Sequence, residues 1–288
     1  MIIYSYNDDN FYIHHSLDKT PDPDNFPMHV HEKCELFYFI SGKGSYTVEG
    51  NDYALTPGSI MLMRGAETHK LHIDSSLPYE RFVVHFSPDS ILNKNSPIRS
   101  MLYDRPLGYG NMIVCSGTSL EFISSCFDRI RRAITLGASE QEISAHLIPV
   151  LYELTYSVNS TYHDVPSPQD GTETLVGNII SYINNNLAEI KNMEFIEQNF
   201  YFSRSYLNKI FKSSTGSTIW EYIIVKRLMK ARSLIQSGKS VLAASAECGF
   251  SDYSSFYRQY KQKFGTSPVK DKASSEKPYS LNKEVETE

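Results

Sequence analysis

The spacing of apolar residues changes along this chain, and the change restricts it to a fold with two kinds of part. Between residues 26 and 86, short β-rich runs alternate with turns that contain Gly or Pro. Such close spacing is typical of an all-β sandwich or barrel. From residue 120 onward, apolar residues recur every three or four positions, which is the period of an amphipathic helix. We therefore expect an α+β protein with a β-rich part before a helical part.

Five segments in the first part are predicted to be strands. They are residues 36–40, 45–48, 53–55, 60–63 and 79–86. Turn signals separate them, for example at residues 41–44 and 49–52. Residues 1–25 are polar and acidic, and we predict an arm followed by a loop there.

Two amphipathic helices are predicted after the strands. The first ends near Gly137, and the second begins where Ser139 and Glu142 have the spacing of a capping box. Their apolar stripes are Leu120, Ile123, Phe127, Ile130 and Ile134, then Ile143, Leu147, Leu151, Leu154 and Val158. The pattern leaves two possibilities open, because these helices either cover the strands or form the seam of a dimer.

Residues 163–172 contain two prolines and no apolar period, so we predict a linker there. It separates a domain of residues 1–162 from a helical domain of residues 173–272, and residues 273–288 are predicted to form a flexible tail. The formal net charge of −5 divides into −9 for residues 1–172, +6 for 173–272 and −2 for 273–288. A basic segment beside an acidic one indicates a polyanion-binding module, although a chance fluctuation would give the same asymmetry.

The cysteines and the apolar runs exclude several classes of protein. Cys34, Cys115, Cys126 and Cys248 are isolated from one another, which argues against a close-paired zinc finger and against a disulfide scaffold. No run approaches the roughly 18 apolar residues of a membrane span, and the first ten residues lack the pattern of a secretory signal. We expect a cytoplasmic protein that does not enter a membrane.

Two helix–turn–helix units are predicted in the basic domain. The first consists of a helix at residues 193–199, a turn at 200–202 and a second helix with Ser203 as its N-cap. The second unit consists of residues 241–248, 249–251 and 252–264, and a longer helix at about 218–237 joins the two units. The predicted inward residues are Tyr206, Leu207, Ile210 and Phe211, then Trp220, Ile224, Leu228, Ala231 and Ile235, then Phe256, Tyr260 and Phe264.

This helical domain resembles the AraC/XylS-type regulators over nearly a hundred residues. The resemblance lies in Ser203, Tyr206, Leu207, Ile210, Phe211, Lys212 and Gly216, in Glu221, Tyr222, Arg227, Leu228 and Ala231, and in Gly249, Phe250, Ser251, Asp252, Phe256, Arg258, Lys261, Phe264, Gly265, Ser267 and Pro268. It implies two recognition helices that enter successive major grooves of DNA. The sequence departs from the pattern at Glu197 and Tyr201, where a small residue and a Gly or Asn are usual.

The resemblance implies a DNA-binding role for the outward residues of both second helices. The base-facing residues would be Arg204, Ser205, Asn208 and Lys209 in the first unit, and Tyr253, Ser254 and Arg258 in the second. Lys and Arg pair with guanine O6/N7 and Asn with adenine, whereas Lys212, Lys261 and Lys263 would contact phosphates. The alternative for each is a solvated surface side chain.

The β-rich domain carries a histidine pattern. The spacing His29-x-His31-x3-Glu35-x6-Gly42, followed by His69, matches a cupin motif, so residues 1–162 resemble a cupin-like sensor barrel with two accessory helices. Two or three His with one carboxylate suit Fe, Mn, Ni or Zn. The four residues therefore either hold a divalent metal or line an effector pocket, for which Tyr38, Phe39, Tyr46 and Phe82 are further candidates.

We expect a ligand-responsive, sequence-specific transcriptional regulator that binds double-stranded DNA. It would respond to a small molecule in the barrel, with a carbohydrate as the first choice from the habit of the family. It would act as a homodimer, contact RNA polymerase if it activates, require no cofactor and not be an enzyme. Two alternatives stay open: a metal-dependent cupin enzyme with a helical appendage, and a constitutive DNA-binding protein whose barrel only dimerises.

Overall fold

A computed structural model describes residues 2–8, 10–26, 28–93, 95–161, 175–215 and 217–275. The chain divides into two compact units, Met1–Asn178 and Ile179–Glu288. The predicted linker at residues 163–172 lies outside the described residues, as do residues 276–288 of the predicted tail. The domain boundaries predicted from the sequence stay predictions.

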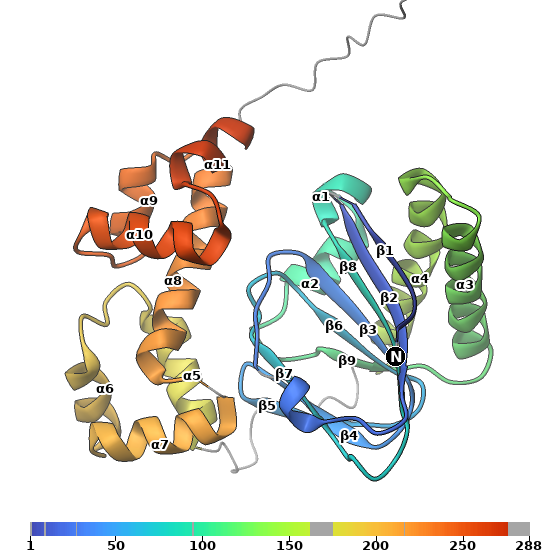
Figure 1. The fold of residues 1–288 in the computed structure, drawn as a ribbon, viewed down its shortest axis with the longest axis horizontal. Helices are drawn as coiled ribbons and strands as arrows, with labels where there is room; N and C mark the ends of the chain where they lie inside the picture. Colours follow the sequence, from blue (N-terminus) through green and yellow to red (C-terminus); the bar gives the residue numbers. More distant parts are fainter. Residues whose placement is uncertain are drawn as a thin grey trace, which may run out of the picture. The chain divides into compact units, whose positions relative to one another are not determined.

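The N-terminal unit contains two antiparallel sheets (Figure 1). The larger sheet has the strand order β1-β2-β8-β3-β6-β9, and the smaller has the order β5-β4-β7. The strands are β1 Ile2–Asn7, β2 Phe11–Asp18, β3 Cys34–Ser41, β4 Gly44–Val48, β5 Asn51–Leu55, β6 Ser59–Met63, β7 His69–Ile73, β8 Tyr79–Phe86 and β9 Met112–Val114. An apolar cluster drawn from both sheets, including Phe37, Tyr46, Met61 and Leu71, fills the space between them.

The prediction of an arm and loop at residues 1–25 is wrong for β1 and β2. On β2, Phe11 and Ile13 are fully buried in one core, while His14 and Ser16 are buried on the opposite face. Polar residues thus occupy interior positions, and the apolar alternation that marks a strand is hidden. The strands β7 and β9 and two short helices, α1 Pro88–Ile91 and α2 Pro97–Tyr103, were also not predicted.

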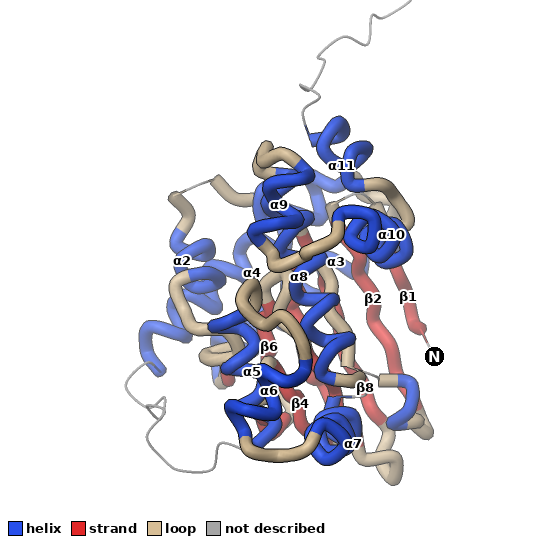
Figure 2. The backbone as a smooth tube through the Cα atoms, turned by 90° about the vertical axis from the view of Figure 1, so that its left-hand side faces the viewer, coloured by secondary structure: helices blue, strands red, loops and turns tan. Residues whose placement is uncertain are grey.

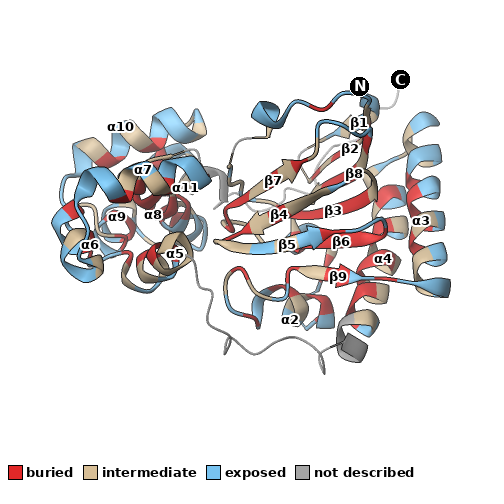
Figure 3. Cartoon of the chain, turned by 90° about the horizontal axis from the view of Figure 1, so that it is seen from below, coloured by how far each residue is buried: buried red, intermediate tan, exposed pale blue. Residues whose placement is uncertain are grey.

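Two long helices, α3 Gly117–Thr135 and α4 Glu140–Thr161, cover the outer face of the larger sheet. Their buried sides face the strands and their exposed sides face away (Figure 3). The predicted capping box is present, since Ser139 and Glu142 exchange side-chain and backbone hydrogen bonds. The sequence left two possibilities open for these helices, and the structure shows the first of them: their apolar stripes cover the sheet. The side chain of Val158 lies outside what the structure describes.

The second unit is entirely helical among its described residues. Its helices are α5 Leu175–Asn186, whose first residues belong to the first unit, then α6 Met193–Phe200, α7 Arg204–Thr215, α8 Ile219–Gln236, α9 Val241–Glu247, α10 Tyr253–Phe264 and α11 Pro268–Ser275. Residues 273–275 of the predicted tail therefore close α11. No helix among the described residues is long and apolar enough to cross a membrane.

Local side chains set where these helices begin. Thr218 and Glu221 form a capping box at α8, and Asp252 accepts hydrogen bonds from the backbone N–H groups of Ser254 and Ser255 at α10. Such caps satisfy backbone donors that a helix start leaves unpaired. The α6–α7 turn has Tyr201 at φ 59° in the left-handed region, where Gly or Asn is more common.

Candidate nucleic-acid interface and sensor site

Helix α7 presents a row of exposed hydrogen-bond donors. The side chains of Arg204, Ser205, Lys209 and Lys212 are exposed, and the helix contains no acidic residue. Leu207 and Phe211 are fully buried on the other side, which fixes the orientation of the helix. The prediction that Tyr206 points inward is wrong, because its side chain is 46% exposed and adds an aromatic ring to the outer face.

Asn208 has a structural partner within the unit. Its Oδ1 accepts a hydrogen bond of 3.1 Å from the backbone N–H of Ile219, the first residue of α8. In the pair of hydrogen bonds that Asn makes to adenine, this oxygen would accept from N6 while Nδ2 donates to N7. The predicted adenine contact therefore competes with the start of α8, and Asn208 is the weakest of the predicted base readers. Glu197, the departure noted in the sequence, similarly accepts from the backbone N–H of Arg204 at 2.7 Å.

Helix α10 repeats the pattern of α7. Its outer face exposes Tyr253, Ser254, Arg258, Lys261 and Lys263, again without an acidic residue in the helix. Phe256 and Tyr260 are buried against α8 and α9. In two views α7 lies at one end of α8 and α10 lies near the other (Figures 1 and 2). The unit thus carries two donor-rich helices that are spaced by α8.

A buried arginine joins the parts of this unit. Arg227 of α8 donates hydrogen bonds to the carbonyl oxygens of Leu187 and Ile190, which follow α5, and of Gly249, which follows α9. Gly249 has φ 85°, and a Cβ at this position would lie 2.5 Å from the carbonyl oxygen of Ala188. Only glycine fits there, so the turn before α10 is held against the segment after α5.

On α8 the buried face differs from the predicted one. Leu228, Ala231 and Ile235 are buried as predicted, whereas Trp220 and Ile224 are only partly buried. Ile219, Tyr222 and Ile223 take the inner positions, because the first half of the helix packs against α7.

The histidine motif of the N-terminal unit converges on one carboxylate. Glu35 of β3 is buried, and its Oε2 lies 2.7 Å from His31 Nε2, 3.4 Å from His69 Nε2 and 3.0 Å from His85 Nε2. Tyr46 donates a hydrogen bond of 3.2 Å to Glu35 Oε1. The ligand atoms of His29, His31, Glu35 and His69 all lie within 4.8 Å of one another, so the structure brings the predicted set together.

His85 was not predicted as part of this site. It lies on β8, where Glu35 and His85 are directly opposite each other in the β3–β8 pairing. The two residues are 50 positions apart in the sequence, and no local spacing connects them. The only sign of this role in the sequence was that His85 is a histidine at an alternate position of a predicted strand.

Electrostatics within this site favour a charged carboxylate. Burial alone would raise the pKa of Glu35, but the imidazoles of His31, His69 and His85 beside the carboxylate hold that pKa well below its usual value. Burial lowers the pKa of His31 against the opposing effect of Glu35, whereas at His69 the nearby carboxylate outweighs burial and the pKa is raised.

Two of the predicted pocket aromatics lie on the wrong face of the sheet. Tyr38 and Phe82 belong to the core beneath α3, where each ring packs on Phe127, and the Tyr38 hydroxyl lies 3.1 Å from Ser124 Oγ. Both faces of the larger sheet are covered, so aromatic residues occur on both, and the sequence could not tell which faced inward. Tyr46 and Phe39 do lie between the sheets.

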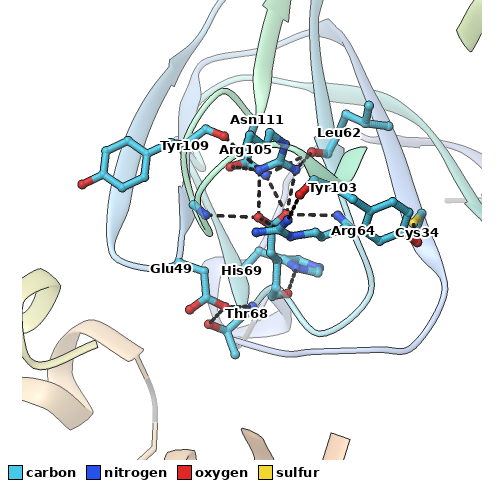
Figure 4. A network of polar contacts seen from close by, with 12 residues as sticks. Cys34, Glu49, Leu62, Arg64, Thr68, His69, Tyr103, Arg105, Tyr109 and Asn111 are labelled. Atoms are coloured by element: carbon cyan, nitrogen blue, oxygen red, sulfur yellow. Dashed lines mark hydrogen bonds and ion pairs between the residues drawn. The ribbon is translucent and has the colours of Figure 1, made fainter. Parts of the chain in front are cut away.

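A second buried polar network, also not predicted, lies next to His69. Arg105 donates to both carboxylate oxygens of Glu67, at 2.8 and 2.9 Å, and to the carbonyl oxygen of Leu62. Asn111 also donates to Glu67, at 2.9 Å. Figure 4 shows Arg105 and Asn111 converging on this centre. The network ties the segment between α2 and β9 to the barrel next to His69.

Comparisons with known proteins match both units. A model of the AraC-like ligand binding domain matches residues 17–145, and a model of a helix-turn-helix domain matches residues 198–273. The Msm operon regulatory protein of Streptococcus mutans is 25% identical over 89% of this chain and 90% of its own length. The transcriptional activator RhaS of Escherichia fergusonii is 23% identical over 84% and 86%, and the lactose operon transcription activator of Staphylococcus xylosus is 23% identical over 82% of each chain.

Proposed function

We propose that this chain, which belongs to the AraC-type transcriptional regulators, reads DNA by placing α7 and α10 in neighbouring major-groove segments. The observation that carries the proposal is the pair of exposed, acid-free donor rows at the two ends of α8. With 18 residues, α8 is about 27 Å long at 1.5 Å per residue. Successive major-groove segments on one face of DNA are about 34 Å apart, which two helices at this spacing can reach.

The exposed cations divide into two predicted roles. Arg204, Lys209 and Arg258 are the proposed guanine readers, with Ser205, Tyr253 and Ser254 beside them. Lys212, Lys261 and Lys263, near the C-terminal ends of the same helices, are the proposed phosphate contacts. Base contacts determine which sequence is bound, whereas phosphate contacts strengthen binding to every sequence.

These roles are separated by a salt titration of DNA binding. We expect Arg258→Ala to weaken binding to the preferred fragment by about 1–3 kcal/mol and to relax base preference. Lys261→Gln should weaken binding to all fragments alike and make the dependence on salt less steep by about one ion. Fluorescence anisotropy on promoter fragments measures both. Lys19→Gln, an exposed site in the other unit, is the control. Failure of the wild type to bind any fragment at low salt would contradict the proposal.

We further propose a carbohydrate effector inside the barrel. The Staphylococcus relative, a lactose operon activator by name, supports this class of ligand. On the inner face of β2, His14 Nδ1 and Ser16 Oγ are buried without a hydrogen-bond partner. Burial lowers the pKa of His14 to about 4, so the ring is neutral near pH 7. Sugar hydroxyls both donate and accept, and would satisfy both atoms.

A thermal-shift screen of monosaccharides and disaccharides on the full chain tests this proposal. A sugar that binds the native state raises the unfolding midpoint and should change the affinity for DNA. Ser16→Ala should abolish the shift while leaving the unliganded midpoint nearly unchanged, because the hydroxyl has no partner to lose. If no sugar shifts the midpoint, or if the variant responds as the wild type does, the effector is of another class or binds elsewhere.

The remaining parts of the proposal concern assembly. The chain would act as a homodimer, since Phe122 of α3, Leu136 directly after α3 and Tyr156 of α4 are large apolar side chains that are exposed. It would contact RNA polymerase when it activates, and it would work by binding rather than as an enzyme. Light scattering of the full chain tests the dimer. A change in DNA affinity on adding effector separates this regulator from a constitutive DNA-binding protein.

A further inference from the structure

Each of the two donor-rich helices, α7 and α10, begins beside a pair of exposed aromatic rings. Phe202 lies in the turn before α7, and its ring centroid is 5.0 Å from that of Tyr206 in the first turn of the helix. Tyr253 and Tyr257 of α10 have ring centroids 6.4 Å apart. All four residues are 36% to 46% exposed. The two helices thus share a feature that the core of the unit does not use.

The aromatic pairs lie on the same outer faces as the cations. Residues three or four positions apart are neighbours on one side of a helix. Tyr206 is three positions before Lys209 on α7, and Tyr253, Tyr257 and Lys261 follow one another at steps of four on α10. The rings are therefore part of the surfaces that are proposed to meet DNA, and the inference below rests on that proposed function.

The chemistry of these side chains restricts what they can contact on a duplex. The phenyl ring of Phe202 has no hydrogen-bond donor or acceptor, so it bonds neither to a phosphate nor to a polar base edge. Base faces are stacked on one another in a duplex, and stacking of aromatic side chains on bases is typical of single strands. The apolar group that base pairs present in the major groove is the 5-methyl group of thymine.

We propose that the aromatic pairs read thymine. Phe202 and Tyr206 contact the methyl group of a thymine in one major-groove segment, and Tyr253 and Tyr257 contact that of a thymine in the other. Burying one methyl-sized apolar group strengthens binding by about fourfold. The preferred DNA site therefore carries a T·A pair in each segment, beside the bases that the neighbouring cations read.

The test replaces thymine by uracil, which keeps the hydrogen-bonding groups of thymine and lacks only the methyl group. A duplex is selected from a random-sequence pool with the full wild-type chain, and its thymines are then exchanged one at a time. Fluorescence anisotropy measures the affinity for each duplex. We expect uracil to weaken wild-type binding by about fourfold at one position or more in each segment, and to have no effect outside the segments.

Two double variants assign these methyl groups to the aromatic pairs. The chain with Phe202→Ala and Tyr206→Ala should bind the thymine and uracil forms equally in one segment and keep its preference in the other. The chain with Tyr253→Ala and Tyr257→Ala should show the reverse, so that each variant is the matched control for the other. Tyr257→Phe retains the ring and should keep the preference for thymine in both segments.

Far-UV circular dichroism establishes that each variant is folded before DNA is added. If the selected duplexes share no thymine in either segment, or if the wild type binds their uracil forms equally well, the inference is overturned while the proposed function stands. A thymine preference that persists in a double variant overturns the assignment for that helix and leaves its rings to a protein partner. A wild type that binds no duplex at low salt refutes both proposals.

Discussion

Replacing Arg105 by methionine is expected to lower the free energy of unfolding of the N-terminal unit by about 3–5 kcal/mol. The guanidinium is buried and donates to Glu67, to the carbonyl oxygens of Leu62 and Tyr109, and to Asn111 Oδ1. Methionine fills a similar volume but leaves the fully buried Glu67 carboxylate without its bidentate partner, so that only the more distant Arg64 guanidinium, at 3.5 Å, still faces it. An uncompensated buried charge costs more than the pair itself contributes.

Urea unfolding of the full chain measures this effect. Far-UV circular dichroism follows both units, and the fluorescence of the single tryptophan, Trp220 in α8, follows the C-terminal unit separately. The tryptophan midpoint should stay unchanged in Arg105→Met. Arg131→Met, which removes an exposed pair with Asp128, should cost no more than about 1 kcal/mol. An Arg105→Met chain as stable as Arg131→Met would show that the network contributes little.

Arg227→Met should destabilise the C-terminal unit by about 3–4 kcal/mol and weaken DNA binding at least tenfold. The substitution leaves the carbonyl oxygens of Leu187, Ile190 and Gly249 without this donor, and each buried acceptor left unpaired costs about 1–3 kcal/mol. It also releases the turn before α10, so α10 loses its fixed position relative to α7.

The matched control is Arg258→Met, which removes an exposed cation from α10. It should weaken DNA binding while leaving the urea midpoint of Trp220 fluorescence unchanged. Arg227→Met should lower that midpoint and the DNA affinity together. Unchanged stability in Arg227→Met would mean that water replaces the guanidinium and that its hydrogen bonds to the three carbonyl oxygens are not needed to hold the unit together.

The helical domain could be predicted closely from the sequence because its signals are local. Thr218 and Glu221, or Asp252 and Ser254, are near neighbours in the chain, and they mark helix starts without knowledge of the rest of the fold. The buried arginine was missed for the opposite reason. Arg227 is among the residues that carry the family resemblance, but its hydrogen-bond partners lie 22 to 40 positions away, and its neighbours in the sequence do not show that it is buried.

The barrel was only partly predictable because strand pairing is a long-range property. The spacing of His29, His31 and Glu35 identified the cluster, since those residues are close in the sequence. His85 joined it only through the register of β3 with β8. The same limit explains Tyr38 and Phe82, because a sheet covered on both faces gives no local sign of which face is inside.

Helix α8 contributes side chains to both helix–turn–helix cores, with Tyr222 against Phe211 at one end and Ala231 beside Phe256 at the other. The two helix–turn–helix units, with α7 and α10, are therefore held at a fixed spacing and a fixed rotation relative to each other. One base pair inserted between their target segments would turn one segment by about 34–36° relative to the other. Promoters under the control of this protein can then change by base substitution within each segment, but hardly by insertion or deletion between the two.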